Sequence, residues 1–548
     1  MENMTPERVN REYAAALQFN TGIDLYETVQ TNENFFIGKQ WEGVKSNGLP
    51  TPVFNFLKRV VLFCVAQVST DNLKLHAKPL PSTSDVAEET LEKFSDILNK
   101  QFAELFERNK VGGLVREFSR NAAVDGDGCL YVYWDNDMQT GQSAKGGICV
   151  ESLMNTQVMF GNPNCRDVQS QPYILIERRM LVSEAKDYAK NHDVKDWNDI
   201  AADSKESGNV EMDELGGEKV TVLLRLWRDK ETGTIHGYEC TKTVELRKDW
   251  DLGISLYPLV WMNWDYIQDC YHGQAMITGL IPNQIFVNKL FAMSMISLMT
   301  LAYPKVVYDK TKVAKWSAKV GAAIGVNGSV DGVAKIIDPA SISPQISQFI
   351  DVAIGYTQKF LGASDVALGD TRPDNAAAII SLQRAAAVPM EITKQNMLQS
   401  IENLGRIFLA FMGSYYGQRI VEVEDETMGK VSISFDFSML KDIPCSIDLD
   451  AGATTYWSEI ANMQTLDNLL MQGKIPTSEY LRRLPNGQIT DRDALVKIMR
   501  AAEQGTVLPT AELNGGTEPT VPELQGGAGY GALQRKINET GEVPREVV

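Results

Sequence analysis

The sequence lacks the features that mark secreted, membrane-spanning and phosphate-gripping proteins. The N-terminal segment MENMTPERVNREY is polar and has no apolar core, which predicts no secretory signal. The most apolar stretch, residues 290–303, is shorter than the roughly 20 residues that a membrane span needs. No dense block of Lys and Arg occurs, and 53 basic against 71 acidic residues give a net charge of −18. Proteins that grip nucleic acid need clustered cations, so this composition argues against that class.

Cysteine and histidine are also sparse, and neither is arranged for catalysis. The seven cysteines are scattered, odd in number and never form a C-x-x-C pair, which predicts reduced thiols in a cytoplasmic compartment. None of the four histidines lies near a Ser or Cys nucleophile motif. The pattern G-x-x-x-x-G-K-[ST] is absent, so a P-loop nucleotide site is not expected. We therefore predict no enzyme activity, no cofactor and no metal.

Two groups of acidic residues are the candidates for metal ligands, and a metal site at either would contradict this prediction. Asp265, Asp269 and His272 would share one face of a helix, but a solvated turn at a domain junction explains them better. The aspartates of FDF and IDLD, within residues 435–450, alternate with apolar neighbours, which indicates solvent-facing positions on strands. Glycines at 321–332 form no phosphate-binding fingerprint and are typical of turns.

Helices are predicted at the start of the chain. A Thr5 cap and Pro6 in the first turn predict a helix over residues 5–30, followed by an aromatic-rich turn, NENFFIGKQWEG. Apolar residues on one helical face predict further helices at 55–68 and about 85–122. The apolar stripe of the second of these helices is Phe94, Ile97, Leu98, Phe102 and Leu105.

Strands follow, because the hydrophobic period changes to two. CLYVYWD, YILIERRM, VTVLLRLWRD and TIHGYECTKTVEL are typical of strands separated by Asp, Gly and Asn turns. Together with the preceding helices they indicate an α+β domain over roughly residues 30–270. A polar, loose insertion is expected near 191–218.

An arm with a tip is the most informative prediction. Pro282 opens a helix that runs to about Ala302, and a Gly-rich, β-like module occupies 303–340. Ser343 and Pro344 then begin a second helix with an apolar stripe, which Gly362 ends. Two helices of similar length that flank a compact β module form an arm. Its apolar stripes exceed what the arm can bury by itself, which predicts cover by neighbouring subunits.

A long kinked helix is predicted after the arm. It runs from about Ala376 to Tyr416, and large apolar residues repeat every seven positions from Met390 to Phe411. Pro389 lies inside the run and should kink it. A strand pair is expected after residue 430, in VSISFDFSML and SIDLDAG, and then two or three helices and a tail rich in Gly, Pro, Thr and Glu.

The order of these elements resembles that of bacteriophage portal proteins, the head–tail connector family. The motif N-F-F-I-G-K-Q-W at 34–41 is similar to the family's pattern of Tyr or Phe followed by G-x-Q-W. VDGDGCLYVY at 124–133 and WDYIQDCYHG at 264–273 resemble successive wing elements. The arm resembles the helix–clip–helix of the portal stem. The resemblance covers about residues 30–503, and it leaves the polar insertion and the acidic tail unmatched.

The resemblance implies an α+β portal fold with a mixed wing, a two-helix stem, a small β clip, a long kinked helix and a helical crown. The implied divisions are an N-terminal segment and wing at 1–270, a stem helix at 271–302, a clip at 303–340, a second stem helix at 341–362, a tunnel loop at 363–375, the long kinked helix with returning wing strands at 376–452, a crown at 453–503 and a flexible tail at 504–548.

The function implied is a ring, typically of twelve copies, at one capsid vertex. Double-stranded DNA would pass through it during packaging and ejection without sequence specificity. The clip would bind the terminase large subunit and later the head–tail adaptor, while wing and crown would face the major capsid protein and scaffold. Twelve copies would carry a formal charge of −216, which is 12 × −18, and such a wall repels phosphate. The expected location is the virion, after assembly in the host cytoplasm.

Two sets of site residues follow from this resemblance. Solvated surface charge is the alternative reading for the cations, and an ordinary surface connection is the alternative for the loop. The candidates that line the DNA channel are Lys359, Asp365, Asp370, Arg372 and Asp374. The candidates that dock partners are Lys310, Lys312 and Lys315.

Other functions stay open at this point. A packaging ATPase or nuclease is one, although the missing P-loop argues against it. A coat or tail component of a virion is another, but such proteins tend to be dominated by strands, unlike the long central helices predicted here. A non-viral helical scaffold is the third. A ring with a central hole in negative-stain images would separate the portal prediction from the others.

Overall fold

The computed structural model describes most of the chain up to residue 499. The described residues are 4–69 without 44, 47 and 49, 73–79, 88–203 without 143, 218–302, 306–337 without 318 and 320–322, 345–360, 388–425, 429–450 without 442 and 444, 456–484, and 495, 496, 498 and 499. Two compact units are present, Met1–Tyr456 and Trp457–Val548.

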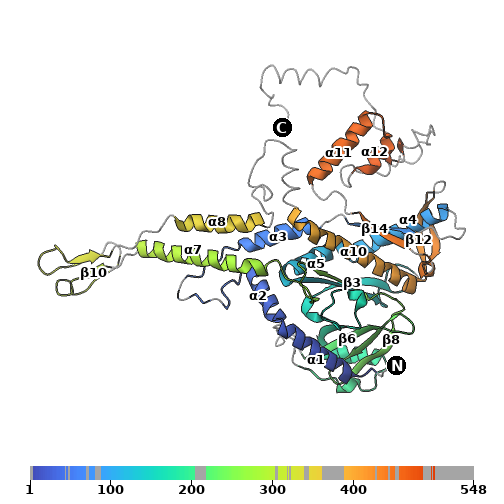
Figure 1. Ribbon diagram of the computed structural model, residues 1–548, viewed down its shortest axis with the longest axis horizontal. Helices are drawn as coiled ribbons and strands as arrows, with labels where there is room; N and C mark the ends of the chain where they lie inside the picture. The colour runs from blue at the N-terminus through green and yellow to red at the C-terminus, as the bar shows by residue number, and fades with distance from the viewer. Residues whose placement is uncertain are drawn as a thin grey trace, which may run out of the picture. The chain divides into compact units, whose positions relative to one another are not determined.

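Two antiparallel sheets form the centre of the first unit (Figure 1). The larger has the order β4 (Val158–Phe160), β5 (Ile174–Leu181), β6 (Lys219–Arg228), β7 (Ile235–Cys240) and β8 (Glu245–Asp251). The smaller has the order β3 (Gly147–Leu153), β2 (Asp127–Asp135) and β9 (Leu259–Asn263). The strands predicted in the four alternating segments are confirmed, and so is the α+β class. Helix α6 (Val182–Asn191) follows β5, and residues 204–217 of the predicted insertion lie outside the described residues.

The first predicted helix is two helices. Helix α1 (Pro6–Gly22) begins as predicted, with the Thr5 hydroxyl accepting a hydrogen bond from the Arg8 amide. Asp24 adopts a left-handed backbone with φ of +54°, which separates α1 from α2 (Leu25–Ile37). The residues NENFFI, predicted as a turn, are the end of α2, and the turn starts only at Gly38.

The second predicted amphipathic helix is also divided. Helix α3 (Phe56–Val68) matches its prediction, and α4 (Glu88–Arg108) is separated from α5 (Val111–Asp125) by Lys110, whose φ is +51°. The apolar stripes of α3 and α4 are buried as predicted and join one large core with both central sheets. The stripe residues of the two helices are Leu57, Val60, Val61, Cys64, Val68, Phe94, Ile97, Leu98, Phe102 and Leu105.

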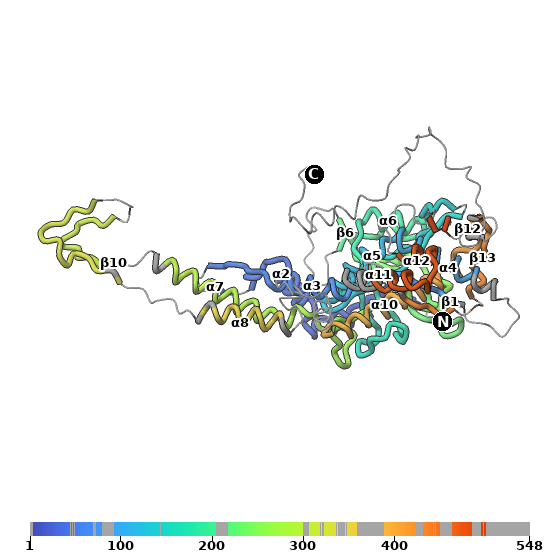
Figure 2. The backbone as a smooth tube through the Cα atoms, turned by 90° about the horizontal axis from the view of Figure 1, so that it is seen from above, coloured from blue at the N-terminus to red at the C-terminus, as the bar shows by residue number. Residues whose placement is uncertain are grey.

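The predicted arm is present. Helix α7 (Ile281–Ala302) and helix α8 (Gln345–Phe360) lie side by side in both Figure 1 and Figure 2. The chain between them contains a two-stranded antiparallel ribbon, β10 (Val306–Tyr308) with β11 (Ala334–Ile336). The capping residues expected before α8, Ser343 and Pro344, lie outside the described residues.

The predicted long helix is described from residue 388 onward, and its end at Tyr416 agrees with the prediction. The described helix α10 runs from Glu391 to Phe411 and continues as a π-helical turn, Met412–Tyr416. The predicted kink position, Pro389, lies in a 3-10 turn directly before α10, and residues 376–387 lie outside the described residues. Helix α10 packs into the large core along one face, as predicted.

The two strands predicted after residue 430 exist but do not pair with each other. Strand β13 (Gly429–Asp436) pairs with β12 (Gln418–Asp425), and β14 (Cys445–Asp450) pairs with β1 (Lys74–Pro79) near the other end of the chain. In the second unit, helix α11 (Tyr456–Met471) and helix α12 (Thr477–Arg483) are joined by a hydrogen bond of 2.6 Å from the Tyr480 hydroxyl to Asp467. Within the part of the chain described, no helix has the length and apolarity that crossing a membrane requires.

Candidate functional site

The base of the arm is held by buried amide side chains. The Asn288 amide of α7 donates to Gln40 Oε1 at 2.8 Å, and Gln40 donates to the Phe35 carbonyl at 3.1 Å. Gln284, one turn earlier on α7, donates to Asn288 at 2.9 Å and accepts from the backbone amide of Leu57 at 3.3 Å. All three amide side chains are fully buried. These bonds fix the start of α7 to the end of α2 and the start of α3, because a buried amide is costly unless it is paired.

This network was not predicted, although the sequence contains its signal. Gln40 is the glutamine of the G-K-Q-W motif, and its exposed fraction is 1%. Gln284 and Asn288 are polar residues four positions apart in a mostly apolar helix, which places them on one face. A polar pair inside an apolar helix indicates a buried partner, but the partner itself cannot be inferred from local pattern.

Helices α7 and α8 are antiparallel and share a small apolar contact. Val287 and Leu290 of α7 pack against Ile350 of α8. At the base, the Asn283 amide donates to the Thr357 hydroxyl at 3.2 Å, so the start of α7 meets the end of α8. The remaining ends of both helices therefore lead into the segment with β10 and β11, which we name the tip and define as residues 306–337.

Much of the arm's apolar surface is exposed. Leu298 of α7 is 55% exposed and Phe349 of α8 is 58% exposed. The predicted stripe on α8 is therefore only partly covered by α7, since Tyr356 is also exposed. The exposed large apolar side chains of the arm helices are Phe286, Met293, Met295, Leu298, Met299, Phe349, Val352 and Tyr356. A continuous run of such residues is typical of a surface that another protein chain covers.

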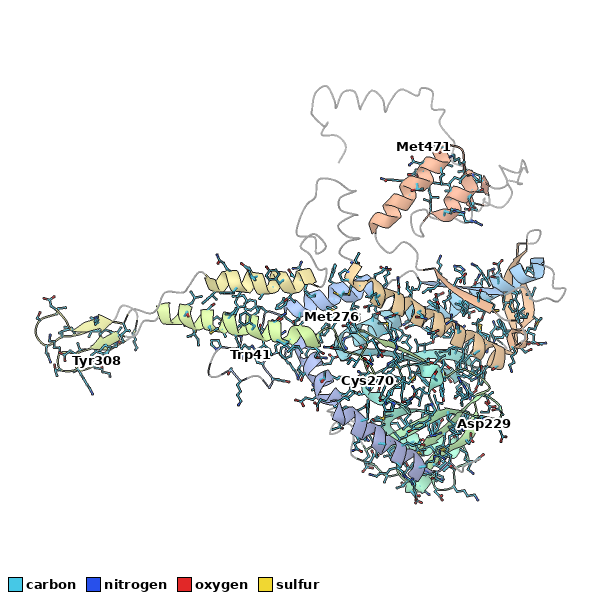
Figure 3. All side chains as sticks on the ribbon, in the orientation of Figure 1. Trp41, Asp229, Cys270, Met276, Tyr308 and Met471 are labelled. Carbon is cyan, nitrogen blue, oxygen red and sulfur yellow. The ribbon has the colours of Figure 1, made fainter. Side chains whose placement is uncertain are left out.

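The tip has its own small core. Tyr308, labelled in Figure 3, stacks on Trp316 with ring centroids 5.2 Å apart, and Val313 and Val333 are buried beside the ribbon. The Asp309 carboxylate accepts from the Thr311 hydroxyl at 2.6 Å and from its amide at 2.9 Å. These hydrogen bonds hold the pKa of Asp309 below its usual range, so this carboxylate stays ionised and engaged in its own turn.

The three predicted docking lysines lie together on the loop that follows β10. Lys310 and Lys315 are exposed, and Lys312 is half-buried and donates to the carbonyl of Asp331 at 3.4 Å. Among the predicted channel residues, Lys359 lies near the end of α8, where the structure describes only its backbone. The other four, Asp365, Asp370, Arg372 and Asp374, lie outside the described residues.

The segment before α7 is tied to strand β2 by a buried carboxylate, which corrects one prediction. Asp127 and His272 are both buried, and His272 Nδ1 lies 2.7 Å from Asp127 Oδ2. Asp127 also accepts from the amide of Asn263 at 2.7 Å and from the backbone amide of Gly273 at 2.7 Å. His272 is therefore not part of a solvated turn. Its ring is packed in the interior because a partner from a distant strand neutralises the cost of burial.

The other acidic residues have structural partners. Asp448 forms an exposed ion pair with Lys78 at 2.7 Å, and Asp436 accepts from the Ser438 amide at 3.0 Å. The solvent-facing prediction is confirmed for these two aspartates. Across the described ranges, no group of three or more His, Cys, Asp or Glu side chains is placed to hold a metal ion.

A second buried carboxylate lies where α5 ends. Asp125 is almost fully buried, 3.7 Å from Arg120, which itself donates to Glu33 of α2 at 2.6 Å. Burial, followed by the charge of Glu33, raises the pKa of Asp125 to about 8. Arg120 opposes this rise but does not cancel it. The contact between α2 and α5 is therefore sensitive to the protonation of one side chain.

Comparison with known proteins agrees with this architecture. Residues 13–436 match the model of one family, described as Phage P22-like portal protein, which is more than three quarters of the chain. No curated protein matches the chain. The match includes both central sheets, the arm, the tip and α10. The chain therefore belongs to the phage P22-like portal protein family, whose members are structural components of the virion.

Proposed function

We propose that this chain forms a closed ring at one capsid vertex, through which double-stranded DNA enters during packaging and leaves during ejection. The observation that carries the proposal is the exposed apolar surface on both arm helices. Copies related by rotation present the same two faces to each neighbour, so one copy's α7 face is covered by the next copy, and the ring closes without leaving an uncovered face. A ring of twelve copies is the expected assembly.

The parts of the chain take the roles that the sequence implied. Residues 1–270 form the wing, 271–302 and 341–362 the stem, 303–340 the clip, and 363–375 the tunnel loop. Residues 376–452 form the long helix with returning strands, 453–503 the crown and 504–548 the tail. Support comes from the order of α7, the tip and α8, and from the core that ties α10 to the wing.

The charge of the chain supports passage of DNA over capture. A net −18 per copy repels phosphate at the scale of the ring, so DNA slides with weak contacts. Lys359 and Arg372 supply transient contacts to phosphate, and Asp365, Asp370 and Asp374 keep the loop's charge negative. No hydrolysis of nucleotide is expected from the chain itself, since the motor belongs to the terminase.

The tip is the surface that exchanges partners. The terminase large subunit occupies it during packaging and the head–tail adaptor afterwards, through Lys310, Lys312 and Lys315. Wing and crown face the major capsid protein and the scaffold, and assembly takes place in the host cytoplasm. The end of an arm suits exchange because a partner can reach it without disturbing the core.

Light scattering and negative-stain imaging test the ring. Leu298→Asp places a charge on the exposed α7 face and should leave the protein folded but monomeric, because a carboxylate resists burial between copies. Ile392→Asp is the matched control, since Ile392 is 73% exposed on α10, outside the arm. Wild-type protein that stays monomeric or dimeric at every salt and concentration would overturn the ring. Intact rings from Leu298→Asp would place the contact elsewhere.

A further inference from the structure

The tip carries the opposite charge to the rest of the chain. Residues 306–337 contain five lysines and two aspartates and no other charged residue, a net charge of +3 in a chain of −18. The remaining residues therefore sum to −21. A basic end on an acidic protein is a local departure from the average, and it selects the partners that the tip attracts.

These cations are not neutralised inside the tip. Within the described residues, Lys310, Lys315, Lys319 and Lys335 form no ion pair. Asp309, which directly precedes Lys310, is engaged by the Thr311 hydroxyl. These four exposed lysines therefore remain available to carboxylates or phosphates of another molecule, while Lys312 also donates to the Asp331 carbonyl.

Apolar side chains accompany the lysines on the tip. One face of the ribbon carries Tyr308, which stacks on Trp316. The opposite face carries Val307 directly across from Lys335, because cross-strand partners point the same way. Val307 is 58% exposed and Val330 is 76% exposed. On this face of the ribbon, Val307 therefore offers apolar contact next to the positive charge of Lys335.

We propose that the tip docks on a protein surface that presents carboxylates around an apolar centre. This inference rests on the proposed function, which makes the tip the docking surface, and it specifies the chemistry that both exchangeable partners share. Exposed valines beside the lysines favour a protein over DNA, because a duplex offers phosphates along its whole outer surface and little that covers Val307 or Val330. Two partners that use one acidic surface type compete for the tip and cannot occupy it together.

Charge reversal tests the electrostatic part. Lys310→Glu/Lys312→Glu/Lys315→Glu rings should lose at least about tenfold in affinity for poly-L-glutamate and for the phage's own terminase large subunit. The corresponding Lys→Arg triple variant should keep both. The matched control is Lys195→Glu/Lys230→Glu/Lys248→Glu, which makes the same change in charge at exposed wing positions and should bind as wild type does.

Apolar truncation and a DNA probe test the rest. Val307→Ser/Val330→Ser should weaken binding of the terminase subunit and leave poly-L-glutamate binding unchanged. Equal or stronger tip-dependent binding of a short DNA duplex would overturn the proposal in favour of nucleic acid. Unchanged terminase binding by the charge-reversed rings would also overturn it. Negative-stain images of every variant separate this failure from a failure of the proposed function, in which wild-type protein forms no ring at all.

Discussion

Helices α7 and α10 have nearly the same length, 22 and 21 residues, but differ in how much of their apolar surface is buried. Helix α10 buries a full stripe in the large core, and Ile392 is its one large apolar side chain that stays exposed. Helix α7 is apolar on nearly every side and leaves at least five large side chains exposed. Its apolar contacts include a few residues of α8, Phe56, and Phe54, whose ring stacks on Phe291 with centroids 4.0 Å apart.

The difference shows that apolarity does not by itself place a helix in a core. Helix α10 is surrounded by α3, β9 and β14 of the same chain, so its stripe is satisfied within one copy. Helix α7 contacts α3 near its start and lies beside α8 along the arm. The exposed apolar surface of α7 is therefore the surface that the proposed ring would cover, whereas the stripe of α10 stabilises the single copy.

The largest expected difference between the two helices is in the free energy of unfolding that is lost when one side chain is truncated. Phe408→Ala in α10 removes a fully buried ring and should lower the free energy of unfolding by about 3–5 kcal/mol. Leu298→Ala in α7 should change that free energy by less than about 0.5 kcal/mol in the unassembled chain, because the side chain is exposed there. Chemical denaturation of monomeric protein measures both. Equal losses would mean that α7 is buried within the single copy.

A smaller effect on stability is expected when the amide network at the arm base is broken. Gln40→Ala removes the acceptor of the buried Asn288 side-chain N–H and one of two side-chain donors to the Phe35 carbonyl, and it should cost about 1–3 kcal/mol. The cost should appear locally, as faster amide hydrogen exchange in the first turns of α7 with little change in α10. Gln395→Ala, at an exposed position of α10, is the control and should leave exchange unchanged. Uniform acceleration across both helices would contradict a local anchoring role.

The smallest expected effect is on thermal stability and comes from Asp125. Like α10, this residue lies in the part of the chain that is stabilised by its own core. Its pKa rises from the usual 3.8 to about 8, so its contribution to stability is present below about pH 4 and is lost as pH rises through about 8. Asp125→Asn cannot ionise and should remove this loss, raising Tm by about 2–4 °C at alkaline pH relative to wild type. Thermal unfolding across this pH range measures the difference. If Tm changes with pH in the same way for both proteins, Asp125 is not the cause of the loss of stability at alkaline pH.

Local signals were enough for much of the fold. The Thr5 cap, the buried face of α3 and the two arm helices were predictable because capping and helical periodicity act over a few residues. The breaks at Asp24 and Lys110 were not, since left-handed backbone at a residue other than glycine carries no reliable signal in the sequence.

The remaining differences between the predicted and the observed fold come from contacts between residues far apart in the sequence. The burial of His272 depends on Asp127, 145 positions earlier, and β14 pairs with β1 instead of with its neighbour β13. At the candidate site, the sequence indicated that the three lysines predicted to dock partners lie between the arm helices, but it did not reveal that Gln40 bonds to α7. Buried polar residues such as Gln40 cannot be assigned from the local sequence pattern, because their hydrogen-bond partners come from distant segments.

The amide anchors also determine the mechanics of the arm. Twenty-two residues at 1.5 Å per residue make α7 about 33 Å long, so a rotation of about 5° at its base displaces its far end by about 3 Å. A packed pair of helices acts as a lever, with Gln40, Gln284 and Asn288 close to its pivot. A side-chain rearrangement at that pivot, small enough to leave the wing unchanged, is amplified at the far end into a shift comparable to the length of a hydrogen bond.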